Sequence, residues 1–131
     1  MTAKNFFTVE GIVCLLFGLG FLLSPNMITA LYDETKLGLN PLGDLYARTF
    51  GALLAAASVS NFILRDAPPS IGRRAWIVFA TIGNVLLAIL NIKAIMQGVQ
   101  NSMGWSSVLL VVLLALWGGS LLSKEKQLAL E

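Results

Sequence analysis

The stretch that decides the fold is "DLYARTFGALLAAASVSNFILRD", which runs from Asp44 to Asp66. It is long and apolar enough to cross a bilayer, because a spanning helix needs about 20 mostly apolar residues. It also carries Arg48 about one helical turn inside its start, and it is rich in Ala, Ser and Gly rather than in Leu and Val. The stretch therefore predicts a membrane helix and raises the question of what its arginine does.

The composition of the whole chain also indicates a membrane protein. Of the 131 residues, 56% are hydrophobic and 12% are charged, and the mean hydropathy is +0.79. A typical soluble domain has about 25% charged residues, so a soluble core does not account for this much apolar sequence. We expect one transmembrane domain over residues 1–131, with the lipid bilayer as its solvent.

Four apolar runs predict membrane spans, over about residues 6–23, 42–64, 75–96 and 105–122. The pairs Ser24-Pro25 and Asn40-Pro41 each place a capping residue before a proline, which favours a helix start and predicts a short interfacial helix over 25–32. The first run is expected to be a span rather than a signal peptide, because no A-x-A-like site follows it. Since backbone groups in lipid must bond within their own segment, the chain should be all-α.

The loops predict how the helices are arranged. Short connections make neighbouring helices antiparallel, so an up-down-up-down four-helix bundle is expected. Basic residues mark alternate ends of the spans at Lys4, at Arg65 with Arg73 and Arg74, and in the tail at Lys124 and Lys126. By the positive-inside rule, both termini should be cytoplasmic. We expect the bacterial inner membrane, or an equivalent energy-transducing membrane, as the location.

Several classes of site are disfavoured by what the chain lacks. There is no His and only one Cys, Cys14, so neither a metal cluster nor a cofactor is predicted. The net charge of +2 is too small to indicate nucleic-acid binding. No phosphate loop, nucleophile elbow or pair of carboxylates is found, so no catalytic residue is assigned and the chain is interpreted as non-enzymatic.

Small residues at four-residue spacing predict close helix packing. They could serve packing within one bundle, or a contact with a second copy or with another subunit. This predicted packing face comprises Cys14, Gly18, Gly51, Ala52, Ala55, Ala56, Ala115 and Gly119.

Glu10 is the carboxylate inside the first predicted span, about a turn from its start. Ionisable groups in membranes are candidates for function. At this depth Glu10 could pair with a basic side chain from the same side, such as Arg65, Arg73, Arg74 or Lys124. The alternative is a role in binding a proton or a cation.

Two further polar groups are singled out. Arg48 should lie at the opposite surface from Glu10, about 20 Å away in depth, where it is expected to pair with Asp44 four residues earlier. In the third span, Asn84 and Asn91 lie on one stripe with Thr81 and Ala88. This stripe should face the bundle, either to form an interhelical hydrogen bond or to line a polar pocket.

The order of four segments resembles a diffuse set of small bacterial four-helix membrane proteins that are DoxX-like in style. The segments are "LLFGLGFLLSP" at 15–25, "ARTFGALLAAASVSNFILRD" at 47–66, "RRAWIVFATIGN" at 73–84 and "NSMGW" at 101–105. The resemblance implies the fold, and DoxX itself is associated with a membrane oxidoreductase complex as a small subunit, which implies an accessory role. Small multidrug transporters share the length and an early Glu, but the aromatic cluster expected around that Glu is not found.

Two functions are therefore expected as alternatives. The first is a non-enzymatic accessory or structural subunit that packs against copies of itself, as a homo-oligomer, or against a larger membrane complex. The second is a small proton- or cation-coupled transporter, or a binder of a small molecule or lipid, that uses Glu10 together with Asn84 and Asn91.

Overall fold

The structure is a computed structural model that describes residues 2–128, with side chains described through residue 124. Lys126, part of the predicted basic tail, therefore lies outside the described side chains. Within the described range the chain is all-α, as predicted, and forms five helices. These are α1 (Ala3–Leu23), α2 (Pro25–Ala30), α3 (Pro41–Arg65), α4 (Ile71–Met96) and α5 (Gly104–Leu128).

Four of the described helices are long and apolar enough to cross a membrane. These segments are Ala3–Leu23, Pro41–Arg65, Ile71–Met96 and Gly104–Lys124. Large apolar side chains remain exposed along them, among them Leu16, Leu53 and Leu116, each about two-thirds exposed. A water-soluble protein rarely exposes so much contiguous apolar surface, so the prediction of a multi-pass membrane chain agrees with the helices that form.

The helix starts follow from capping residues in the sequence. The Thr2 hydroxyl accepts a hydrogen bond from the Asn5 amide at the start of α1. Asn40 Oδ1 accepts one from the Gly43 amide at 2.7 Å at the start of α3, and a serine hydroxyl at position 70 caps α4 in the same way. Each cap satisfies an amide that the first turn leaves without an intrahelical partner.

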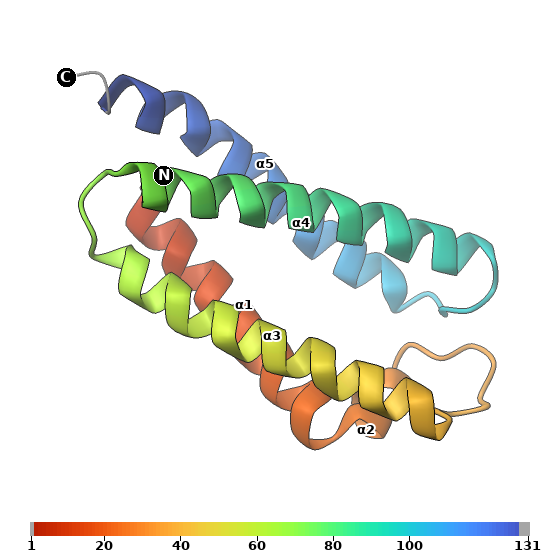
Figure 1. Ribbon diagram of the computed structural model, residues 1–131. Coiled ribbons are helices and arrows are strands. Elements are labelled where there is room, and N and C mark those ends of the chain that lie inside the picture. Colours follow the sequence, from red (N-terminus) through yellow and green to blue (C-terminus); the bar gives the residue numbers. More distant parts are fainter. Residues whose placement is uncertain (1, 129–131) are drawn as a thin grey trace.

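The long helices pack as two pairs. The first pair is α1 with α3, and the second pair is α4 with α5, while the contacts between the pairs are much fewer. Successive long helices alternate in direction, so that α1 and α4 begin near the same end of the molecule, where α3 ends (Figure 1). The molecule is therefore two helix pairs laid side by side rather than four equally packed helices.

Glycine allows the two helices of the first pair to approach closely. A Cβ built at Gly51 would lie 2.5 Å from the backbone nitrogen of Leu22, and one at Gly18 would lie 2.7 Å from that of Ala55. Such distances leave no room for a side chain at either position. The Ser58 hydroxyl adds a buried hydrogen bond of 2.9 Å to the carbonyl of Gly11 across the same interface.

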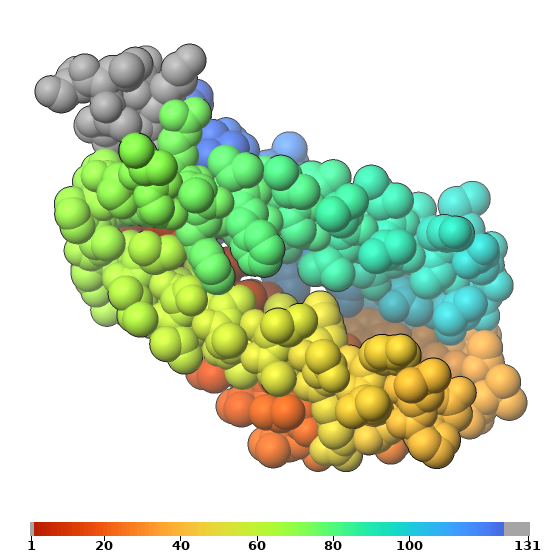
Figure 2. Space-filling model, viewed as in Figure 1, coloured from red at the N-terminus to blue at the C-terminus, as the bar shows by residue number. Residues whose placement is uncertain are grey.

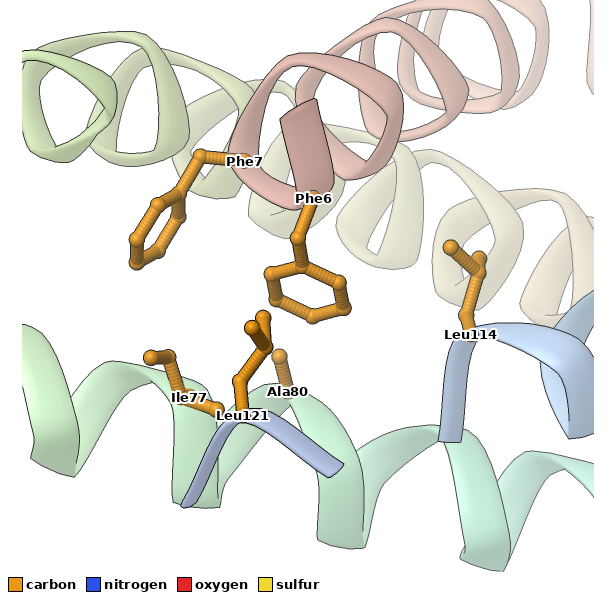
Figure 3. Packing of buried hydrophobic residues seen from close by; sticks show 6 residues of the cluster. All are labelled: Phe6, Phe7, Ile77, Ala80, Leu114 and Leu121. Atoms are coloured by element: carbon orange, nitrogen blue, oxygen red, sulfur yellow. The ribbon is translucent and has the colours of Figure 1, made fainter. Parts of the chain in front are cut away.

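The two pairs are joined at one end by an aromatic cluster. Phe6 and Phe7 of α1 are completely buried and point toward α4 and α5 (Figure 3). Phe6 also lies edge-on to Trp117, with 5.7 Å between ring centroids. The described residues that complete this cluster are Ile77, Ala80, Leu114 and Leu121.

Backbone hydrogen bonds between two loops join the pairs at the other end. The Asn101 amide donates to the carbonyl of Tyr32 at 2.8 Å, and the Glu34 amide donates to the carbonyl of Val99 at 3.2 Å. Gly98, with φ of +70°, allows the chain to turn sharply after α4. The pairs thus meet at both ends, and between those ends the surface is hollowed (Figure 2).

Candidate functional site

A cavity of about 170 Å³ lies between the two helix pairs. Its wall is mainly apolar, with a few polar side chains from α1, α4 and α5 and from the loop ends. Mostly apolar concavities with a few placed polar groups are the usual form of small-molecule sites. The lining residues are Glu10, Val13, Cys14, Phe17, Phe21, Tyr32, Phe50, Leu54, Asn84, Leu87, Asn91, Gln100, Ser107, Leu110 and Val111.

Glu10 and Asn84 meet at one end of this cavity. The Asn84 side-chain amide donates a hydrogen bond of 3.0 Å to Glu10 Oε1, which joins α1 to α4. Both residues are buried, with 6% of Glu10 and 5% of Asn84 exposed. The structure therefore brings together two of the predicted site residues that the sequence places 74 positions apart.

The second carboxylate oxygen of Glu10 is buried and has no hydrogen-bond partner in the part of the chain that the structure describes. Among the described residues lining the cavity, none is Lys, Arg or His. A buried polar atom without a partner is costly in a low-dielectric environment. The carboxylate is therefore poised to accept a hydrogen bond from a donor that occupies the cavity.

The predicted pairing of Glu10 with a basic side chain is not observed. Arg65 instead contacts Asp66 at 3.0 Å, and Arg73 donates to the backbone carbonyl of Ala67. These arginines are held at the chain reversal between α3 and α4, whereas Glu10 lies two turns inside α1. Because α1 begins at Ala3, before the apolar run itself, Glu10 lies further from the start of its helix than the run alone indicates.

The opposite end of the cavity is polar as well. The Gln100 side-chain amide donates a hydrogen bond of 3.0 Å to Asn91 Oδ1, and the Asn91 amide donates to the carbonyl of Leu87 at 2.7 Å. Ser107 and Tyr32 line the same cavity with their hydroxyl-bearing side chains. Asn91, the third predicted site residue, lies seven positions after Asn84, or about 10 Å along α4.

A second, more open hollow of about 320 Å³ adjoins the cavity and shares Phe21, Tyr32 and Gln100 with it. We call it the vestibule. Its remaining lining residues come from the two loops that join the helix pairs: Thr29, Asp33, Thr35, Gly38, Leu39 and Val99. The Thr35 hydroxyl, and then the backbone amides of Gly38 and Thr35, donate to the Asp33 carboxylate and hold its pKa below the usual range.

Aromatic side chains form part of the cavity wall, and Phe21 also lines the vestibule. Phe21 stacks on Phe17 with 6.4 Å between ring centroids and lies edge-on to Phe50 at 5.6 Å. Phe17, Phe21 and Phe50 all line the cavity. These rings come from α1 and α3, and Phe17, the nearest of them along α1, is seven residues or about 10 Å from Glu10, so the expectation that no aromatic cluster surrounds that glutamate stays a prediction.

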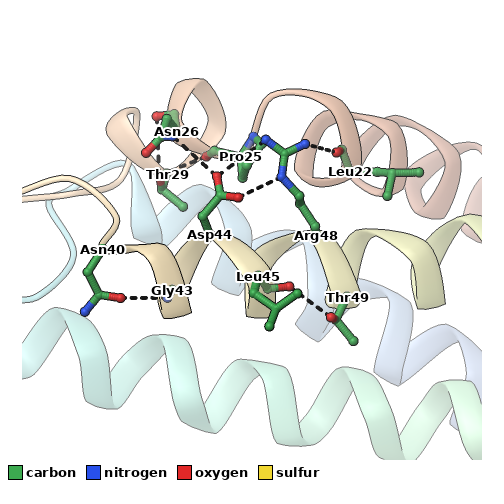
Figure 4. A network of polar contacts seen from close by, with 10 residues as sticks. All are labelled: Leu22, Pro25, Asn26, Thr29, Asn40, Gly43, Asp44, Leu45, Arg48 and Thr49. Carbon is green, nitrogen blue, oxygen red and sulfur yellow. Dashed lines mark hydrogen bonds and ion pairs between the residues drawn. The ribbon is translucent and has the colours of Figure 1, made fainter.

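Arg48 and Asp44 lie outside the cavity, at the junction of α1, α2 and α3. Arg48 Nε contacts Asp44 Oδ2 at 2.8 Å, and Arg48 Nη1 donates to the carbonyl of Leu22 at 2.8 Å (Figure 4). Leu22 is in the last turn of α1, where carbonyls lack intrahelical partners. Arg48 thus holds the end of α1 against α3, which answers the question raised by its position.

The predicted packing face is divided by the structure. Gly18, Gly51 and Ala55 lie at the closest approach of α1 and α3, and Cys14 is buried in the cavity wall. Ala52 and Ala56 are exposed and Ala115 is half-buried. Gly119 is exposed, with no described atom within 4 Å of a built Cβ, whereas its neighbour Gly118 is the buried glycine of α5.

Sequence reasoning missed several cavity residues. Tyr32, Gln100 and Ser107 are polar residues near helix ends, where polar residues are common, so nothing in their local pattern distinguishes them. Phe17 and Phe50 are two of many apolar residues in their spans. Among the described residues there is no group of three or more Asp, Glu, His or Cys side chains placed to hold a metal ion.

Comparisons with known proteins give no relative from which a function can be transferred. No family model matches the chain, and no curated protein and no solved structure gives a significant match.

Proposed function

We propose that this chain is a multi-pass membrane protein that binds a small, largely apolar molecule in the cavity between its helix pairs. The observation that carries the proposal is the buried Glu10 oxygen without a partner, at the end of a cavity with mostly apolar walls. Glu10 and Asn84 provide the polar anchor, and Asn91 lies at the far end.

The proposal includes an orientation in the membrane. The helices cross up-down-up-down with both termini cytoplasmic, in the bacterial inner membrane or an equivalent membrane. The distribution of basic residues supports this, because Lys4, Arg65, Arg73, Arg74 and Lys124 all belong to one end of the molecule. The vestibule then opens on the side opposite the cytoplasm.

The test is to fill the cavity and ask which bound molecules are lost. Val111→Trp places a large ring in the cavity wall, whereas Leu113→Trp on the same helix adds the same ring at an exposed position. Both variants and the wild type are purified from membranes in mild detergent, and the small molecules that accompany them are identified by mass spectrometry. We expect a molecule that is retained by the wild type and by Leu113→Trp but is absent from Val111→Trp. Identical profiles for all three proteins would contradict binding in the cavity.

A second candidate function is an accessory subunit that packs against a second copy or a larger complex. It is favoured by Ala52, Ala56 and Gly119, small residues that remain exposed after the chain has folded. Small residues on a lipid-facing surface permit close helix contact with a partner. Crosslinking in native membranes followed by identification of partners tests it, and a lone monomer under those conditions would count against it.

A further inference from the structure

We infer that the ligand is an elongated organic cation that enters through the vestibule and places its charged nitrogen on Glu10. The inference rests on the proposed function, since it concerns the same cavity. It adds the charge of the ligand, the position of the charged group and the route of entry.

The sign of the charge follows from the ionisable groups along the route. The carboxyl-bearing residues that line the cavity and the vestibule are Glu10 and Asp33, and none of the described lining residues is Lys, Arg or His. A concave surface of one sign with apolar walls concentrates counter-ions of the opposite sign. A negatively charged molecule would meet no cationic side chain among the described lining residues, whereas a cation meets a carboxylate at each stage.

The place of the charged group follows from which carboxylate oxygens are already satisfied. In the vestibule, Asp33 accepts hydrogen bonds from the Thr35 amide at 2.8 Å and from the Gly38 amide at 3.1 Å, so both its oxygens are in use. In the cavity, Glu10 Oε1 accepts from Asn84, but Oε2 has no partner within the described chain. An ammonium or amide N–H of the ligand would complete the hydrogen bonding of Glu10 and form a charge-assisted bond there.

The shape of the ligand follows from what lies between the two polar ends. Asn84 and Asn91 are about 10 Å apart along α4, and the wall between them is built from Leu87, Leu110 and Val111 with the phenylalanines opposite. An extended chain advances about 3.3–3.6 Å for every three backbone atoms, so about eight or nine chain atoms cover this length. The body of the ligand should therefore be apolar and about as long as a linear eight-carbon chain.

The entry route follows from the position of the vestibule. The cavity and the vestibule share Phe21, Tyr32 and Gln100, so a molecule that leaves the vestibule passes these side chains to reach Glu10. The loops around the vestibule are tied to one another by backbone hydrogen bonds. The opening is thus on the side where the α2–α3 loop meets the α4–α5 loop, away from Phe6 and Phe7.

The experiment compares three molecules with the same chain and different head groups: octylamine, 1-octanol and octanoate. Each is titrated at pH 7 into the protein in phosphatidylcholine nanodiscs, and the signal from empty nanodiscs is subtracted. Octylamine is protonated at this pH, as a lysine side chain is. We expect octylamine to bind at least about tenfold more tightly than either of the others, because a charge-assisted hydrogen bond replaces an unsatisfied oxygen.

The variants identify the groups responsible. Glu10→Gln keeps an acceptor for Asn84 but removes the charge, so octylamine should lose its advantage over 1-octanol. Glu34→Gln removes an exposed carboxylate outside both hollows and should change nothing. Leu39→Trp fills the vestibule and should lower the association and dissociation rates together, whereas Leu37→Trp, at a position 86% exposed, should not.

The outcomes separate the two proposals. If the three molecules bind equally and only Val111→Trp weakens them, the cavity binds apolar molecules and the inference of a cation is wrong. If Val111→Trp changes the binding of none of them, the proposed function fails as well. The comparison of head groups uses the wild-type chain, so it decides the sign of the charge even if Glu10→Gln does not fold. Unchanged rates in Leu39→Trp would overturn the entry route.

Discussion

At the scale of single residues, Glu10 and Arg48 have different roles. The Arg48 guanidinium donates to the carbonyl of Leu22 and pairs with the carboxylate of Asp44, so its contacts are made within the fold. Glu10 keeps one oxygen without a partner in the described chain and faces a cavity. Of the two, Glu10 is the residue that the fold leaves available for a ligand.

Replacement of Arg48 tests its structural role. Arg48→Ala removes the ion pair and leaves the end of α1 without its donor, so we expect the free energy of unfolding to fall by about 1 kcal/mol. The free energy of unfolding of Arg48→Lys should lie between those of the wild type and Arg48→Ala, because an ammonium lacks the planar fork that reaches both acceptors. The stabilities of both variants are measured by unfolding them in detergent with increasing sodium dodecyl sulfate while circular dichroism is recorded. An Arg48→Ala midpoint equal to that of the wild type would contradict this role.

Asp33 provides a test of the loop that borders the vestibule. The pKa of Asp33 is lower in the fold than in the unfolded chain. Its hydrogen bonds therefore stabilise the loop at pH values above the unfolded pKa of about 3.9. This stabilisation is lost as the pH falls through the lower folded pKa. Titration of the Asp33 carboxyl carbon by nuclear magnetic resonance should give a midpoint below about 3.9. The amide shifts of Thr35 and Gly38 should move with it. A midpoint at or above that value would show that these bonds do not form.

At the scale of helices, packing in the first pair depends on the absence of side chains. Gly18 and Gly51 face one another where α1 and α3 cross. The sequence motif identified these glycines, because small residues at four-residue spacing are typical of close helix contacts. The same motif also included Ala52, Ala56 and Gly119, which are exposed, since spacing alone does not define which face of a helix meets its neighbour.

A methyl group at Gly51 should separate these helices. We expect Gly51→Ala to lower the free energy of unfolding by about 1–3 kcal/mol, because the new Cβ meets backbone atoms that cannot rotate away. Gly83→Ala is the matched control, since no described atom lies within 4 Å of its Cβ and alanine favours a helix by up to about 1 kcal/mol. The detergent unfolding assay compares both variants. Equal destabilisation of the two would contradict the close crossing.

The spans could be predicted from the sequence, but the site could be predicted only in part. Runs of apolar residues bounded by Ser24-Pro25 and Asn40-Pro41 indicate helices because lipid permits few alternatives to them. The contact between Glu10 and Asn84 depends on how far α1 and α4 are shifted along their axes, and composition does not define that shift. Phe17, Phe21 and Phe50 converge through the crossing of α1 with α3, which no local pattern indicates.

At the scale of the whole molecule, the cavity lies between two helix pairs that are joined near both of their ends. Phe6 and Phe7 fill the space at one end, and backbone hydrogen bonds between two loops join the pairs at the other end, beside the vestibule. In lipid, association rests on packing rather than on the removal of apolar surface from water. A cavity can therefore persist between the pairs as long as both end contacts hold.

Truncation of Phe6 should weaken the end contact on which the cavity depends. In soluble cores Phe→Ala costs about 3–5 kcal/mol. Because lipid is as apolar as the cluster, we expect only the packing part of that cost, about 2 kcal/mol. Leu116→Ala, at a position 68% exposed, is the control and should have little effect. If Phe6→Ala unfolds at the same detergent fraction as Leu116→Ala, the cluster does not hold the pairs together.

The position of Cys14 gives experimenters a natural reporter. It is the sole sulfhydryl in the sequence, and it lies in the wall of the cavity. A small fluorinated tag attached to it would lie in the cavity wall without any engineered mutation, and its signal would respond to whether that space is dry, wet or filled. Spectroscopy on the unmodified sequence can thus test directly whether the proposed cavity becomes occupied.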